Sequence, residues 1–352
     1  MMVLPVMQDD YLIGFLSDLL NVPSPTGRTG EAIDFIAREL SKFSGLEISK
    51  TRKGALLVKW PGEHDSIQRA VTAHTDTLGG MVKEIKPNGR LMITRIGGLV
   101  LNGVETEGCT VFTASGSSFR GSFMFDRPSV HVNGAAVNET QRSETNMEIR
   151  LDEKVRDVEG VEALGIQVGD FVAFDPRVVI SNGFVRSRFL DDKACVANLV
   201  SAIKTLSDAG LRPRMTTYFL FSNYEEVGHG ASAGLPSEVS ELLTVDMAAV
   251  GNGQNSDEFN ATICLKDSGG PYHHGFSSRL RKIAEDNGIP YKTDIYTYYR
   301  SDGEAAWLAG ADMQVALIGP GVDASHNYER THIEALRATT QWVIAYLLSD
   351  EA

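Results

Sequence analysis

The chain has 352 residues, of which 42% are hydrophobic and 22% charged, and its formal net charge is −13. This is the composition of an ordinary globular protein, long enough for two domains or for one domain with an insertion. The acidic charge argues against nucleic-acid binding, and no apolar run approaches the roughly 20 residues that span a membrane.

The first part of the chain alternates helix and strand patterns. Apolar residues recur every three or four positions over residues 9–21 and 31–43, which predicts two helices separated by the Pro- and Gly-containing turn "VPSPTGRTG". Residues 54–60 and 69–76 are apolar and short, and they predict strands.

The pattern changes between residues 81 and 181. Short strand-like pieces such as "RLMITRIGG", "SFRGSFMF" and "GDFVAFDP" are broken by Gly, Pro and Asn, without a long amphipathic helix. We expect an inserted, small all-β domain at 81–181, within a catalytic domain formed by residues 1–80 and 182–352.

Helix and strand patterns alternate again after the insertion. Helices are predicted over residues 193–210, 277–288 and 333–350, and strands over residues 215–223, 241–251 and 313–321. This alternation predicts an α/β fold in which helices cover a mostly parallel sheet.

Neither cysteine usage nor the start of the chain points to secretion. Cys109, Cys195 and Cys264 are widely spaced and form no CxxC pattern, so a disulfide framework and a thiolate zinc site are both disfavoured. The opening "MMVLPVMQDDYL" is a poor signal peptide, and we therefore expect a cytoplasmic protein.

Potential ligands and acids stand where the predicted strands end, which is where open α/β sheets bind their ligands. These residues are His74, Asp76, Asp191, Asp192, Glu225, Glu226, Asp246 and His326. Taken singly each has an ordinary structural explanation, such as a helix N-cap for Asp192 or a turn residue for Asp246.

The set is more informative than its members. Two histidines, two aspartates and a glutamate suit two metal ions, with one carboxylate bridging and a nitrogen and a carboxylate completing each site. A further carboxylate that is not a ligand would take the proton of a water molecule. The adjacent Glu225 and Glu226 would supply one residue for each task, although spacing alone does not assign them.

The segments "AHTD", "LDDK", "EEVGHGA", "VDMA" and "SHNYERTH" occur in the order found in a known family. The chain resembles the dinuclear-metal aminopeptidases of the tetrahedral and glutamyl aminopeptidase family, formerly labelled endoglucanases. "NVPSPTG" and "GIQVGDFVAFDP" extend the resemblance over most of the chain.

The resemblance implies a role for each residue of the set. His74 and Asp246 would bind one metal and Glu226 and His326 the other, with Asp191 bridging both. Glu225 would be the general base, and Asp76 would orient His74. The implied cofactors are two divalent metal ions, zinc or cobalt.

Some positions depart from the common family pattern. Thr77 stands where glutamate is frequent, Lys193 stands where arginine is frequent, and "SHNYERTH" replaces "HSPxE"-like text. The ending is most similar to a branch found beside synthesis of an acetylated glutamine-dipeptide osmolyte, so these changes concern the choice of substrate.

We therefore predict a hydrolase that removes N-terminal residues from short peptides. The alternatives are an N-acyl amidase, a carboxypeptidase or a specialised osmolyte-dipeptide hydrolase, and a non-catalytic binding protein on the same fold. The resemblance implies that the insertion is a lid or dimerisation domain and that the chain forms a homo-oligomer, dimer-based and up to a dodecamer.

Other polar residues have weaker claims to the site. Arg300, Ser301 and Asp302 are read as a polar loop that could also line the substrate pocket. His273 and His332 are read either as site neighbours or as residues of loops and helix starts, and Cys195 is read as a small core residue.

Overall fold

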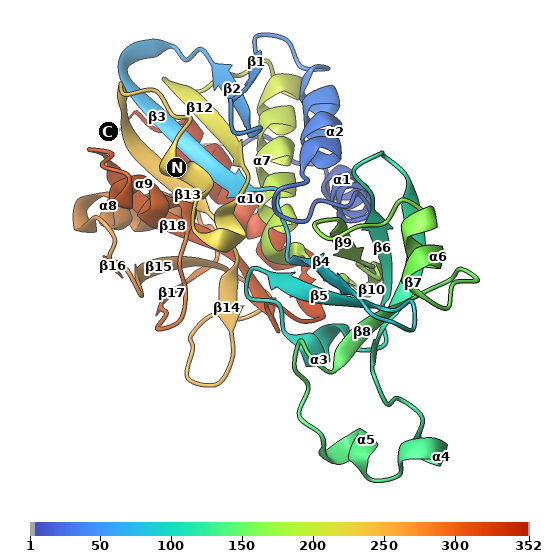
Figure 1. Cartoon of the computed structure of the whole chain (residues 1–352). Coiled ribbons are helices and arrows are strands. Elements are labelled where there is room, and N and C mark those ends of the chain that lie inside the picture. The colour runs from blue at the N-terminus through green and yellow to red at the C-terminus, as the bar shows by residue number, and fades with distance from the viewer. Residues whose placement is uncertain (1–3, 351–352) are drawn as a thin grey trace. The chain divides into compact units, whose positions relative to one another are not determined.

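A computed structural model describes residues 4–350 of the chain. It divides into two units, one formed by Thr77–Pro176 and the other by the chain up to Asp76 together with the chain from Arg177 onward (Figure 1). These divisions fall a few residues before the boundaries expected from the sequence, and all the candidate site residues belong to the second of these units.

The two-part unit contains a large mixed sheet with helices on both faces. Its strands are β1 (Glu47–Lys50), β2 (Leu56–Trp60), β3 (His64–His74), β10 (Val179–Ser181), β11 (Phe184–Ser187), β12 (Met215–Ser222), β13 (Val239–Val245), β14 (Ala248–Val250), β15 (Ala261–Asp267), β16 (Gly270–Pro271), β17 (Tyr291–Ile295), β18 (Gln314–Asp323) and β19 (Glu329–His332). Its helices are α1 (Asp9–Leu20), α2 (Gly30–Leu40), α7 (Leu190–Asp208), α8 (His274–Asp286), α9 (Asp302–Leu308) and α10 (Ile333–Leu347), with the short 3₁₀ turns η1 (Glu225–Val227) and η2 (Gly230–Ser232).

The centre of this sheet is parallel. β12, β3, β13 and β18 lie side by side in that order, and each neighbouring pair is parallel. Because parallel strands end at the same edge of a sheet, the residues that follow these four strands are brought together.

Alternate residues of the central strands pack on opposite faces of the sheet. Ala70, Leu220, Leu242 and Leu317 join a buried cluster that includes Ala306 of α9. The other face is covered by α7 and α10, and α1 packs on α7 (Figure 1). Burial on both faces explains why these strands are continuous apolar runs in the sequence.

The predicted strand over residues 241–251 is two strands. β13 ends at Val245 and β14 begins at Ala248, because pairing with β18 is interrupted at Asp246 and Met247 and then resumes in the same register. Asp246 lies in this break, where its backbone N–H donates to the carbonyl of Ile318 at 3.0 Å. The break places the Asp246 side chain at the edge of the sheet.

The unit formed by Thr77–Pro176 is a small closed β-barrel, as expected for the insertion. Its strands are β4 (Gly79–Ile85), β5 (Leu91–Ile96), β6 (Gly108–Phe112), β7 (Ser118–Phe125), β8 (Met147–Leu151) and β9 (Phe171–Phe174), and its short helices are α3 (Leu101–Val104), α4 (Val130–Asn133), α5 (Ala136–Glu139) and α6 (Val158–Ala163). Alternating residues such as Val111, Phe123 and Ile149 fill the barrel.

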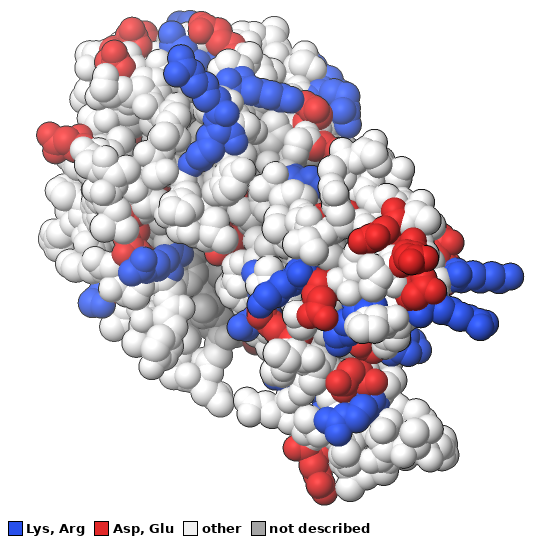
Figure 2. All heavy atoms as spheres, viewed as in Figure 1, with Lys and Arg blue, Asp and Glu red and all other residues white. Residues whose placement is uncertain are grey.

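Lys and Arg side chains are interspersed with Asp and Glu side chains on the face shown in Figure 2. Among the described residues, no helix is long and apolar enough to cross a membrane.

Candidate metal centre and active site

The ends of the four central strands carry most of the predicted site residues. His74 is the last residue of β3, Glu225 and Glu226 follow β12 in η1, Asp246 follows β13, and His326 lies beyond β18. Asp191 enters from the start of α7. The structure therefore brings together residues that lie up to 252 positions apart in the sequence, from His74 to His326.

His74, Asp191 and Asp246 form the tightest group. One ligand atom from each residue lies within 4.8 Å of the others, and all three side chains are buried. The Nε2 atom of His74 is 3.1 Å from Oδ1 of Asp191. An imidazole and two carboxylates at this spacing can hold a divalent cation.

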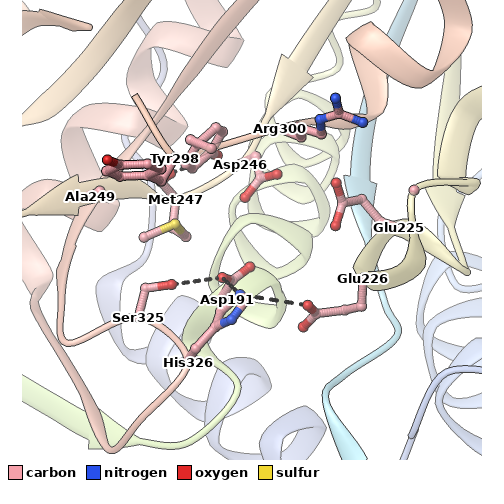
Figure 3. Close-up of a pocket in the computed structure, with 12 residues that line it drawn as sticks. Asp191, Glu225, Glu226, Asp246, Met247, Ala249, Tyr298, Arg300, Ser325 and His326 are labelled. Carbon is pink, nitrogen blue, oxygen red and sulfur yellow. Dashed lines mark hydrogen bonds and ion pairs between the residues drawn. The ribbon is translucent and has the colours of Figure 1, made fainter. Parts of the chain in front are cut away.

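The second carboxylate oxygen of Asp191 faces a different histidine. Nε2 of His326 lies 3.6 Å from Oδ2 of Asp191 and 3.6 Å from Oε2 of Glu226. Figure 3 shows Asp191, Glu226 and His326 converging on one side of the pocket. Asp191 thus presents one oxygen to each of two groups of nitrogen and carboxylate donors.

Glu225 points into the same space as these residues (Figure 3). Its Oε2 atom is 3.7 Å from Nε2 of His74. The side chain lines the pocket beside both donor groups, which is where a proton acceptor for a bound water molecule has to lie.

Asp76 contacts His74 through its main chain more closely than through its carboxylate. Nδ1 of His74 is 2.9 Å from the carbonyl oxygen of Asp76 and 3.7 Å from Oδ1. The carboxylate accepts hydrogen bonds from the Thr26 hydroxyl and from the amides of Glu225 and Glu226, at 2.6, 3.1 and 3.3 Å. Asp76 therefore also anchors the turn that carries both glutamates.

Burial dominates the electrostatics of the site. Burial, reinforced by the charge of Asp191, raises the pKa of Asp246 to about 8. Burial likewise raises the pKa of Glu225 and of Glu226 well above their usual value. For Asp191 burial acts in the same direction, but the hydrogen bonds from His74 and Ser325 and the charges of His74 and His326 together outweigh it, and its pKa is lowered.

The donor set fits divalent cations. Oε1 of Glu226 is a buried oxygen for which no hydrogen-bond partner is found among the described residues. Crowded buried carboxylates disfavour one another's ionisation, and cations placed between them would offset both burial and mutual repulsion.

A pocket of about 430 Å³ opens over these residues. It is also lined by residues of four further segments, namely Gly228, Met247, Ala249, Tyr298, Tyr299, Arg300 and Ser325. The pocket is large enough for part of a short peptide. Arg300 contributes a positive charge to its wall.

Several weaker sequence interpretations are corrected by the structure. Asp192 is not a helix N-cap: Phe189 holds that position, and Oδ2 of Asp192 accepts the His74 amide at 3.1 Å. The segment 300–302 is only partly a loop, because α9 begins at Asp302 and the side chain of that residue is buried.

His273 and His332, which the sequence left as possible site neighbours, are helix caps. His273 accepts a hydrogen bond from the Phe276 amide at the start of α8, and His332 accepts one from the Glu334 amide at the start of α10. Cys195 is fully buried, and burial raises the pKa of its thiol well above the usual value, as befits an inert core residue.

The sequence did not predict the residues that support the site through hydrogen bonds without lining the pocket. Ser24 donates to the carbonyl of Thr75, and Thr26 donates to Asp76, so the "NVPSPTG" turn supports the end of β3. Glu329 accepts from the amides of Asp191 and His326. The resemblance offered the only signal: Ser24 and Thr26 lie in "NVPSPTG" and Glu329 lies in "SHNYERTH", but neither segment indicated these contacts.

Comparison with known proteins places the chain in a family. The model of the M42 glutamyl aminopeptidase family matches residues 54–342. A Bacillus subtilis (strain 168) protein named "Putative aminopeptidase YhfE" is 47% identical over 335 residues, which cover 95% of this chain and 96% of that protein. The chain belongs to the M42 glutamyl aminopeptidase family, which is a family of peptide hydrolases.

Solved structures with low sequence identity share the fold. A TET aminopeptidase from the marine sediment archaeon Thaumarchaeota archaeon SCGC AB-539-E09 has a TM-score of 0.86 at 18% identity, covering 97% of each chain. The TET1 peptidase of Pyrococcus horikoshii, described as assembling into a tetrahedron or a large octahedral shell, has a TM-score of 0.84 at 22% identity, covering 96% of this chain and 99% of that one. The α/β unit with its small all-β insertion is the TET aminopeptidase fold.

Proposed function

We propose that the protein is an aminopeptidase that uses two divalent metal ions to hydrolyse short peptides. The observation that supports this most strongly is the position of Asp191, whose two oxygens face His74 and His326 respectively. A carboxylate between two separate sets of donors is the arrangement that a bridged pair of cations requires.

In this proposal His74 and Asp246 hold one cation, and Glu226 and His326 hold the other. Asp191 contributes one oxygen to each. The nitrogen and oxygen donors are those preferred by zinc, and they suit cobalt as well. Family membership supports metal dependence, and the cluster of His74, Asp191 and Asp246 supplies a ligand set for it.

When bound, the two cations would polarise the scissile carbonyl and acidify the attacking water. Glu225 would accept the proton from that water and return it to the nitrogen of the departing amine. Its Oε2 atom lies 3.7 Å from Nε2 of His74, beside both donor groups, so the carboxyl is placed for both transfers. The carboxylate of Asp76 would keep Glu225 in place by accepting a hydrogen bond from the Glu225 amide.

The barrel formed by Thr77–Pro176 would serve as a lid or dimerisation domain in a homo-oligomer. The support is the similarity in fold to TET peptidases, one of which is described as a tetrahedral or octahedral assembly. A shell of this kind would restrict access to short substrates.

Related amide hydrolases could use the same residues, so substrate choice requires its own experiment. Purified protein reconstituted with zinc, cobalt or manganese should cleave amino-acid anilides and dipeptides with a free N-terminus. Cleavage restricted to N-acylated dipeptides would favour the N-acyl amidase or osmolyte-dipeptide alternative, and cleavage from the C-terminus would favour a carboxypeptidase. Inactivity towards the whole panel in fully metal-loaded protein would favour a binding protein.

A further inference from the structure

Glu329 is a buried carboxylate behind the proposed metal centre. It is the first residue of β19, its exposed fraction is 2%, and it does not line the pocket. Oε1 accepts the amide of His326 at 3.0 Å, and Oε2 accepts the amide of Asp191 at 3.1 Å. One side chain therefore joins the backbones of the two residues that face each other across the second proposed cation.

Neither backbone segment is held by a regular element at this point. His326 has φ +66°, a left-handed conformation that is uncommon for a residue with a side chain. Asp191 has ψ 101°, outside the helical range, although it lies in the first turn of α7. Amides in such positions find no partner in a helix or a strand ladder, so the acceptor supplied by Glu329 fixes where they lie.

The contact extends to the Asp191 carboxylate itself. Ser325, which precedes His326 in the same loop, donates from its hydroxyl to Oδ2 of Asp191 at 3.0 Å (Figure 3). A shift of the loop would therefore move both the His326 imidazole and a donor to the oxygen that faces it. Because Glu329 holds the loop and the start of α7 together, it controls this spacing.

We propose that Glu329 is a positioning residue that sets the distance between Asp191 and His326 and thereby the affinity of the cation bound by Glu226 and His326. This inference rests on the proposed two-metal function. It goes beyond that function because it assigns a role to a residue that reaches neither substrate nor metal.

The test is a titration of metal-free protein with zinc and with cobalt, followed by calorimetry and by elemental analysis. Glu329→Gln keeps the shape of the side chain but replaces one acceptor oxygen with an NH₂ group, which cannot accept from an amide. We expect one of the two sites to weaken by about 10- to 100-fold, as is typical when a partner behind a ligand is lost. Activity should recover when excess metal is added.

A second variant separates position from charge. Glu329→Asp keeps the negative charge but is one methylene shorter, so its oxygens cannot reach both amides. We expect it to weaken the same site. The matched control is Glu258→Gln. Glu258 is a buried carboxylate whose two oxygens accept hydrogen bonds from the Arg330 guanidinium at 2.6 and 2.8 Å. This control should bind both ions like the unaltered chain.

The outcomes are distinct. If Glu329→Gln binds both ions with unaltered affinity and only its unfolding midpoint falls, Glu329 is merely structural and the inference is wrong. If Glu329→Asp binds both ions with wild-type affinity, the negative charge of Glu329 matters and its position does not. That result would also overturn the inference. Should Glu329→Gln not fold, the aspartate variant alone decides. An unaltered chain that binds fewer than two ions contradicts the proposed function instead.

Discussion

At the scale of single residues, the buried carboxylates of the site fall into two sets. Asp191, Glu225, Glu226 and Asp246 line the pocket, whereas Asp76, Asp192 and Glu329 accept main-chain amides. An amide donor stabilises a buried carboxylate without a cation. Among the described residues, these amide hydrogen bonds separate the carboxylates that support the site from those that face the pocket.

Glu225 and Glu226 are neighbours with different surroundings. Glu226 lies 3.6 Å from His326, whereas Glu225 lies 3.7 Å from His74 on the other side of Asp191. The 3₁₀ turn after Tyr224 directs both side chains into the pocket (Figure 3). The assignment of Glu225 as base and Glu226 as ligand predicts different results when each is changed.

Glu225→Gln should retain both metal ions and lose at least about 100-fold in kcat, because an amide cannot take up the water's proton. Steady-state kinetics and elemental analysis of the same sample check this. Glu238→Gln, on an exposed glutamate in the same region of the chain, is the control and should be unaltered. Turnover close to wild type in Glu225→Gln would rule out Glu225 as the base.

At the scale of elements, the site depends on how closely the end of β13 approaches β18. A Cβ atom added to Gly319 would lie 1.7 Å from the carbonyl oxygen of Asp246 and 2.6 Å from its carbonyl carbon. Both are main-chain atoms, so the only way to make room is to move the segment that carries Asp246. The absence of a side chain at Gly319 therefore allows the main chain of Asp246, a candidate ligand, to take its position.

Gly319→Ala should lower the free energy of unfolding by about 1–3 kcal/mol and weaken the cation held by His74 and Asp246. Gly14→Ala is the matched control, because nothing lies within 4 Å of the added Cβ on helix α1. That control should gain roughly 0.5–1 kcal/mol from the better helix former. Urea unfolding of metal-free protein and a zinc titration measure the two effects. A Gly319→Ala protein with unaltered metal affinity would show that Asp246 is not a ligand.

Sequence patterns predicted the elements that are long and strongly periodic, such as α1, α7 and β12. They predicted one strand over residues 241–251, because apolar content does not reveal that pairing with β18 is interrupted at Asp246 and Met247. They placed no helix at Asp302, whose polar neighbours conceal that the residue is buried and accepts from Thr72, Ser222 and Ala231. Local composition does not contain such long-range partners.

The same limit applies to the site. Strand-end positions predicted which residues would meet, and family resemblance suggested their roles. The contribution of Glu329 could not be predicted, because its partners at Asp191 and His326 are set by the tertiary structure. The role of the Asp76 carboxylate in anchoring η1 likewise depends on the packing of β3 beside β12.

At the scale of the whole molecule, the function follows from family membership and from one feature of the geometry. The M42 model and the 47%-identical relative establish the class of peptidase. The two-metal mechanism rests on the position of Asp191, whose two carboxylate oxygens face His74 and His326. The proposed roles of the other site residues depend on this arrangement.

The most direct test of that claim is the metal content of the full chain after reconstitution with zinc and removal of excess metal by gel filtration. We expect close to two ions per chain, and we expect Asp191→Ala to retain fewer than one, since both sites lose a ligand. One ion or none in the unaltered chain, or two ions in Asp191→Ala, would contradict the account.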